Sequence, residues 1–224
     1  MIKKTWIQMG MPVTVEIVDS TAKESAFTKI FDYFNYIDEK FSTYKSTSEI
    51  SLVNSQKLTP DKYSRDLVEV LQMCEQTKQE TNGFFDIDYK GKIDPSGLVK
   101  GLAIYRAAKI LEDDGFKNYY LDVGGDIQVG GYNQEFSVWS VGIKNPFNQK
   151  EIVKTLYVTD KGVATSGTYI RGHHIYNPKT KRPVDDIVSL TVIGPNIYEA
   201  DRYATAAFAM GYEGIKFIES LTDF

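Results

Sequence analysis

Apolar side chains recur along the chain at two spacings, which predict both helices and strands. In residues 12–18, Val13, Val15 and Ile17 alternate with polar residues, as is typical of a half-buried strand. Between residues 21 and 38 the apolar positions lie three and four apart, which predicts one buried helical face. The positions on that face are Ala26, Phe27, Ile30, Phe31, Phe34 and Ile37.

The same patterns continue to the end of the chain. A helix is predicted over 64–80, with an Asn82-Gly83 stop signal and with Leu67, Val68, Leu71 and Cys74 facing inward. Residues 41–54 read as a polar loop. Further helices are predicted over 96–113 and up to Met210-Gly211, and strands over 119–123, 136–143, 152–158 and 188–193. Because strands and helices mix without a regular βαβ repeat, we expect an α+β fold in a single domain, residues 1–224.

Composition and charge narrow the class of protein. With 224 residues, 42% of them hydrophobic, the chain can bury a sizeable core. A net charge of -4 and scattered basic residues argue against a nucleic-acid partner. No run approaches the ~18 apolar residues of a membrane span. The first ten residues lack the apolar region of a signal peptide, so we expect a cytoplasmic protein, or an exported one if the natural chain begins earlier. The single cysteine, Cys74, excludes an internal disulfide and is interpreted as a core residue.

Asp201 and Thr205 are the first candidate ligands. They stand four residues apart in the helix that ends near Met210, so their oxygens project from one face. Carboxylate and hydroxyl oxygens suit Mg²⁺ better than zinc or copper. The spacing alone is common and is weak evidence of a metal site.

Two glycine-containing segments suggest phosphate binding. Gly97, Lys100 and Gly101 lie at a predicted helix start, where free N–H groups and a cation favour a pyrophosphate. Their spacing matches neither the dinucleotide-binding nor the P-loop pattern. Residues 164–169 place hydroxyl groups beside Gly167, as a phosphate-binding turn does, although a plain turn explains them equally well.

The remaining candidates each have a structural alternative. His173 and His174 are adjacent, so in a strand at most one faces a given site. The Gly124-Gly125-Asp126 segment predicts a tight turn in which Asp126 satisfies backbone donors. Phe84, Phe85 and Asp86 suit a flat heterocycle, but the phenylalanines are equally consistent with the core.

Eight segments in one order resemble the ApbE family, the FAD:protein FMN transferases. The resemblance covers nearly the whole chain. Its segments are Met9-Gly10-Met11; Phe41-Ser42-Thr43-Tyr44 with Ser48-Glu49-Ile50-Ser51 and Asn54; Gly83-Phe84-Phe85-Asp86; Asp94-Pro95-Ser96-Gly97-Leu98-Val99-Lys100-Gly101; Gly124-Gly125-Asp126; Ser166-Gly167-Thr168-Tyr169; His174-Ile175-Tyr176-Asn177-Pro178; and Ala200-Asp201-Arg202-Tyr203-Ala204-Thr205.

The resemblance implies a T-fold-like α+β domain with mixed or antiparallel sheets packed by helices. It also implies that FAD is a substrate, that Mg²⁺ is the cofactor, and that FMN moves onto a Thr or Ser hydroxyl of an acceptor flavoprotein, releasing AMP. Carried over by position, the metal ligands are Asp201, Thr205 and the main-chain carbonyl of Val99; His174 is the catalytic base and Lys100 a helper. FAD contacts fall on Met9, Thr43, Tyr44, Lys45, Asp86, Gly97, Gly101, Ser166, Gly167 and Tyr169.

Three features depart from the family pattern. Asn177 stands where the family usually has Asp, and Lys181 where it has Gly. The usual export and lipid-attachment segment is absent, and the chain ends at Phe224 without the closing strand. An FAD pyrophosphatase, a non-catalytic FAD-binding homologue and an unrelated α+β domain therefore remain alternatives. The acceptor, the number of metal ions and the oligomeric state stay open.

Overall fold

The computed structural model describes residues 1–168 and 175–224, and it is built around one antiparallel sheet. The six strands lie in the order β1-β2-β5-β6-β9-β12, and every neighbouring pair is antiparallel. The strands are β1 (Ile2–Gln8), β2 (Met11–Ile17), β5 (Tyr119–Val123), β6 (Asp126–Gly130), β9 (Gly162–Gly167) and β12 (Ser189–Gly194).

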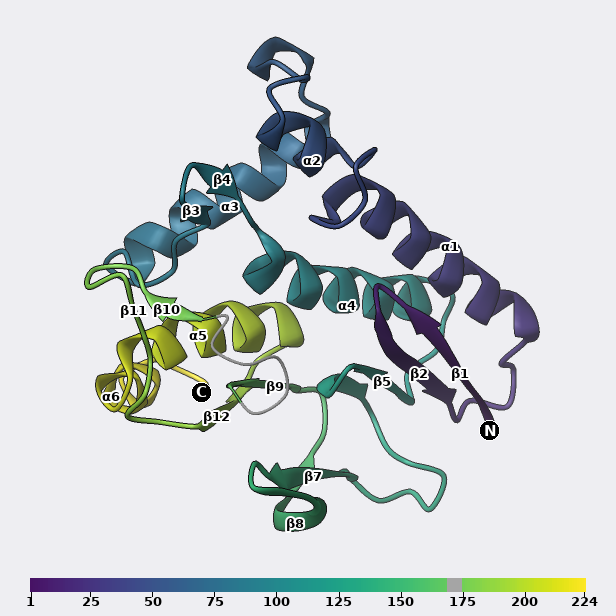
Figure 1. Ribbon diagram of the computed structural model, residues 1–224. Coiled ribbons are helices and arrows are strands. Elements are labelled where there is room, and N and C mark those ends of the chain that lie inside the picture. The colour runs from purple at the N-terminus through teal and green to yellow at the C-terminus, as the bar shows by residue number, and fades with distance from the viewer. Residues whose placement is uncertain (169–174) are drawn as a thin grey trace.

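Helices cover one face of this sheet (Figure 1). α4 (Ser96–Asp113) and α5 (Ile197–Met210) pack against the strands and against each other, and α1 (Glu24–Phe41) packs on α4. The main hydrophobic core lies between these helices and the sheet, with Phe34, Leu111 and Leu121 fully buried. The remaining helices are α2 (Glu49–Asn54), the 3-10 helix η1 (Pro60–Lys62), α3 (Arg65–Glu80) and α6 (Glu213–Glu219).

A separate hairpin covers part of the other face. It consists of β7 (Trp139–Asn145) and β8 (Asn148–Val158), and a second, smaller core joins it to β6 and β9. The Trp139 Nε1–H donates to the Gly130 carbonyl at 2.9 Å, and the Trp139 ring lies 5.4 Å from that of Tyr120. Two short hairpin pairs complete the fold: β3 (Asp88–Tyr89) with β4 (Lys92–Ile93), and β10 (Tyr176–Asn177) with β11 (Arg182–Pro183).

Two tight turns meet at one end of the sheet. Met9-Gly10 joins β1 to β2 and Gly124-Gly125 joins β5 to β6, and all four residues have positive φ, the geometry of two-residue hairpin turns. The Gly124 N–H donates to the Pro12 carbonyl at 2.9 Å. This glycine is required because a Cβ there would lie 2.8 Å from the Met11 sulfur. The two turns therefore form one continuous edge.

The structure confirms the α+β class and the main predicted elements, with four corrections. Phe31 is 42% exposed, and its ring lies 6.1 Å from that of Trp6 on the edge strand β1 rather than in the core. Val68 is 40% exposed because the buried line of α3 is Leu67, Val70, Cys74 and Thr77. The predicted loop 41–54 contains α2, whose N-cap Ser48 accepts the Ser51 N–H. The edge strand β1 was not predicted, whereas the antiparallel central sheet agrees with the predicted mixed or antiparallel sheets.

Candidate functional site

The predicted metal ligands lie where the start of α4 meets the middle of α5. The Gly101 N–H donates to Asp201 Oδ2 at 2.7 Å, and the Asp201 residue is 7% exposed. One helical turn further along α5, the Thr205 hydroxyl lies 3.4 Å from the Gly97 carbonyl oxygen. The spacing of four on each helix thus brings the two predicted groups together: Gly97 and Gly101 on α4, Asp201 and Thr205 on α5. We call this contact the α4–α5 junction.

The two glycines allow this close approach. A Cβ on Gly101 would lie 2.6 Å from Asp201 Cβ and 2.9 Å from the Ile197 carbonyl oxygen. A Cβ on Gly97 would lie 3.0 Å from Thr205 Cγ2. These separations are below normal van der Waals contact, so a larger residue would push the helices apart. The glycines at the start of α4 therefore have a packing role, and their phosphate role stays a prediction.

The donor set at the α4–α5 junction consists of oxygen atoms. It offers the Asp201 carboxylate, the Thr205 hydroxyl and main-chain carbonyls, a combination that suits a hard divalent ion such as Mg²⁺. The Val99 side chain is in the core and 8% exposed, so Val99 can contribute only its main chain. Within residues 1–168 and 175–224, no group of three or more His, Cys, Asp or Glu side chains forms a separate metal site.

A buried ion pair connects α4 to the sheet beside the junction. Lys100 Nζ lies 2.6 Å from Asp126 Oδ2, and Asp126 is only 3% exposed. The other Asp126 oxygen accepts the Thr165 N–H at 3.0 Å. Asp126 therefore bonds β9 and holds the Lys100 ammonium, while the N–H of Gly125 in the turn donates to Asp122 instead.

Asp122 is a second carboxylate at this end of the sheet, and it was missed by the sequence analysis. Its side chain accepts the Gly125 N–H at 2.8 Å. Burial and the Asp126 charge raise the pKa of Asp122, and the Gly125 hydrogen bond and the charges of Lys100 and Lys144 only partly oppose this. The signal that could have identified it is its place four residues before Asp126 across a two-residue turn.

Ser166 and Gly167 lie at the same end of the sheet. Ala164 belongs to the core under the helices, and because side chains alternate along a strand, Ser166 faces the same side. Ser166 is 7% exposed, and its neighbour Thr165 is the residue that bonds Asp126. Met9, half-buried, occupies the adjacent turn. Residues far apart in sequence therefore converge around the first turn of α4.

Other predicted FAD contacts have local partners. Lys45 pairs with Asp38 at 2.6 Å and Glu39 at 2.5 Å on α1, and Tyr44 is 98% exposed. Thr43 belongs to the same exposed loop. Asp86 pairs with Lys78 of α3 at 2.9 Å and accepts the Asp88 N–H at 3.1 Å. The structure ties these residues to α1 and α3 rather than to the α4–α5 junction.

Phe85 links this region to the junction. A Cβ on Gly97 would lie 3.5 Å from the Phe85 ring, and Phe85 is 2% exposed. Phe85 is therefore a core residue, which was the structural alternative to a heterocycle contact, and it packs against the start of α4.

Tyr169, His173 and His174 lie outside the described residues, but the segment that follows clarifies one departure from the family pattern. Asn177 Oδ1 accepts the N–H groups of Lys179 at 2.9 Å and Thr180 at 3.2 Å. An amide oxygen fills this turn-capping role as well as a carboxylate does.

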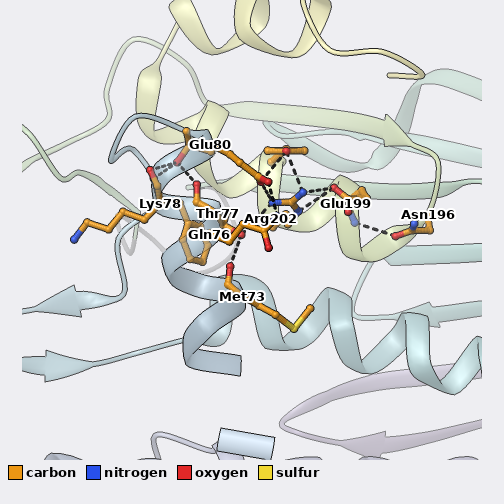
Figure 2. Close-up of polar contacts among 11 residues, drawn as sticks. Met73, Gln76, Thr77, Lys78, Glu80, Asn196, Glu199 and Arg202 are labelled. Carbon is orange, nitrogen blue, oxygen red and sulfur yellow. Dashed lines mark hydrogen bonds and ion pairs between the residues drawn. The ribbon is translucent and has the colours of Figure 1, made fainter. Parts of the chain in front are cut away.

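The sequence analysis also missed a group of polar contacts around one arginine, Arg202, on the other side of α5. Figure 2 shows the Arg202 guanidinium between Glu80 of α3 and Glu199 of α5. It donates to the Thr77 hydroxyl at 3.1 Å and to Glu199 at 2.6 Å, and it is 5% exposed. Because Asp201 points to α4 and Arg202 to α3, two consecutive residues fix α5 on two helices. A charged residue within the buried α5 segment was the available signal.

Two surface hollows lie away from this site. Their volumes are about 230 and 560 Å³, and both are lined by Glu112, Tyr119 and Asp160 near the other end of α4. Neither is lined by a predicted site residue. In the described part of the chain, no helix is long and apolar enough to cross a membrane.

Comparisons with known proteins agree with the fold and with the ordered motifs. The model of the ApbE family matches residues 9–91 and 88–223. A Vibrio cholerae protein named FAD:protein FMN transferase is 32% identical over 131 residues, which is 54% of this chain and 39% of the relative. A Haemophilus influenzae protein of the same name is 24% identical, covering 91% of this chain and 79% of the relative.

Solved structures show the same fold. The flavin transferase ApbE from Vibrio cholerae superposes with a TM-score of 0.85 at 22% identity, covering 97% of this chain and 89% of that one. The ApbE protein from Thermotoga maritima gives a TM-score of 0.83, also at 22% identity. The T-fold-like ApbE architecture predicted from the motifs is therefore confirmed. The match to the Vibrio cholerae sequence relative spans about two fifths of that relative's length.

Proposed function

The chain belongs to the ApbE family, and from that premise we propose that it is a Mg²⁺-dependent FAD:protein FMN transferase. A Thr or Ser hydroxyl of an acceptor flavoprotein attacks the FMN phosphorus of FAD. The new phosphoester bond forms as the pyrophosphate P–O bond breaks, and AMP leaves with the bridging oxygen. The hydroxyl proton passes to a base on the enzyme.

The α4–α5 junction is the observation that carries this proposal. In this chain the motif residues Asp201 and Thr205 meet Gly97 and Gly101 at contact distance. An unrelated α+β domain would give no reason for four motif residues to pack together. The junction also has the oxygen donors that the proposed cofactor needs.

Asp201 and Thr205 would hold Mg²⁺ through their side chains, and Val99 through its main-chain carbonyl. When bound, the ion neutralises charge that develops on the phosphate oxygens. Two side-chain oxygens would not hold Mg²⁺ tightly by themselves, so FAD phosphates and water would supply further oxygen ligands. Metal affinity should therefore be higher with FAD than without it.

Lys100 supplies a positive charge beside the phosphates. Because buried Asp126 holds its ammonium at 2.6 Å, this charge is fixed in place and does not need to be ordered during the reaction. The predicted phosphate contacts Gly97, Gly101, Ser166 and Gly167 would supply main-chain groups and a hydroxyl, which suit a diphosphate.

His174 is proposed as the base that takes the hydroxyl proton. Histidine has an ordinary pKa of about 6.5, which suits proton transfer near neutral pH. Asn177 does not argue against activity, because its side chain caps a turn in which no carboxylate charge is required.

Incubation with FAD and Mg²⁺, with and without an acceptor protein, tests the proposal when the products are weighed by mass spectrometry. We expect an acceptor heavier by one FMN group, together with AMP. Free FMN and AMP at the same rate without acceptor would identify a pyrophosphatase instead. Tight FAD binding with no product would identify a non-catalytic homologue. The acceptor should carry a Thr or Ser in a flavinylation motif.

A further inference from the structure

The end of the β7–β8 hairpin exposes large apolar side chains. Phe147 is 83% exposed, Val153 54% and Ile152 49%. Monomeric proteins rarely expose such groups together, and clusters of them mark surfaces for partner proteins. Lys144 pairs with Ile152 across the hairpin, so the apolar residues and this lysine are neighbours.

This part of the hairpin is also basic, although the whole chain has a net charge of -4. Lys144, Lys150 and Lys154 are all exposed. The one acidic residue among them, Glu151, accepts a hydrogen bond from Asn145 at 2.7 Å. We define the hairpin tip as the exposed residues Lys144, Phe147, Lys150, Ile152, Val153 and Lys154.

The hairpin tip lies at the site end of the sheet. β7 begins at Trp139, whose Nε1–H donates a hydrogen bond to the Gly130 carbonyl. Gly130 ends β6, at the opposite end of that strand from the Gly124-Gly125 turn. From there β7 runs back over the sheet, because Val141 of β7 lies in the same small core as Ile127, which follows Asp126 at the start of β6. Figure 1 shows the hairpin under the sheet, on the face opposite α4 and α5. The hairpin tip, which follows Val141, therefore projects toward the end of the sheet that carries the Gly124-Gly125 turn.

We propose that the hairpin tip is the docking surface for the acceptor protein, which presents apolar and acidic side chains next to its reactive hydroxyl. This inference rests on the proposed function. A folded acceptor can place its hydroxyl at the α4–α5 junction only by covering part of the surrounding rim. The lysines attract the acidic side chains during approach, and the apolar residues hold the docked complex.

Steady-state flavinylation of a folded acceptor domain tests the docking surface. The probe is a purified acceptor domain that the Vibrio cholerae relative also modifies, at saturating FAD and Mg²⁺. For F147S we expect the KM for the acceptor to rise about tenfold, as for a residue in the centre of an interface, with kcat and the KM for FAD unchanged. For the double variant K150E/K154E we expect a similar rise that becomes smaller at high salt.

Phe136 provides the matched control. It is 90% exposed but precedes the start of β7, at the far end of the hairpin, so F136S should leave the acceptor KM unchanged. Equal acceptor KM values for the wild type, F147S and K150E/K154E would overturn the docking surface while leaving the transferase intact. No flavinylated product from the wild type would overturn the proposed function itself, and the docking surface with it.

Discussion

Replacing Gly101 with alanine tests whether close helix contact builds the site. The added Cβ would lie 2.6 Å from Asp201 Cβ and 2.9 Å from the Ile197 carbonyl oxygen, whereas carbon atoms normally stay about 3.5–4.0 Å apart. The α4–α5 junction must therefore open by about 1 Å. Overpacking of this kind costs about 1–3 kcal/mol, offset by about 1 kcal/mol from the better helix propensity of alanine.

The expected net loss of up to about 2 kcal/mol corresponds to a Tm lower by up to about 8 °C for a chain of this size. Thermal unfolding followed by circular dichroism measures it. Opening the junction also lengthens the hydrogen bond from the Gly101 N–H to Asp201, so the Mg²⁺ concentration for half-maximal activity should rise. G97A, whose new Cβ would lie no closer than 3.0 Å to any neighbouring atom, the nearest being the Thr205 methyl, should show a smaller effect on both. A G101A protein with the wild-type Tm and Mg²⁺ requirement would refute the reasoning.

Three further predictions concern charges and one departure from the family pattern. Burial works to raise the pKa of Glu80, but hydrogen bonds from Arg202 outweigh it and the pKa is lowered. The ionised Glu80 therefore stabilises the fold above pH 4.5, and this stabilisation is lost as the pH falls further. The free energy of unfolding measured against pH should depend less on acid in E80Q than in the wild type. K100M leaves Asp126 buried without its cation and should lower the free energy of unfolding by about 3 kcal/mol, with K100M/D126N recovering part of that loss in urea melts. N177D should change kcat less than about twofold, because either side chain caps the turn.

The hydrophobic pattern predicted the long helices because their buried faces repeat without interruption. The apolar positions of 26–37 and the glycines at 97 and 101 placed α1 and the start of α4 correctly. The pattern failed where an element is short or lies at an edge. α2 has six residues and one buried side chain, and β1 is an edge strand with most side chains exposed, so neither has a clear period.

Some contacts of the candidate site could likewise be predicted from the sequence, and others could not. The spacing of Asp201 and Thr205 gave one side of the α4–α5 junction, and the family motifs gave the other. Spacing could not show that Lys100 pairs with Asp126, because this contact depends on where β6 lies under α4. Nor could it find Arg202, whose partners Thr77 and Glu80 are more than a hundred residues away in sequence.

Mass spectrometry of an acceptor protein incubated with FAD and Mg²⁺ tests the central claim most directly, using the wild type, D201A and H174A. The account predicts an acceptor heavier by one FMN group with the wild type, and loss of that product by at least about a hundredfold in both variants, since each removes a group proposed to act in the transition state. Circular dichroism should show that both variants remain folded. Full activity in both folded variants would contradict the assignment of the site, and an unmodified acceptor with the wild type would contradict the proposed function.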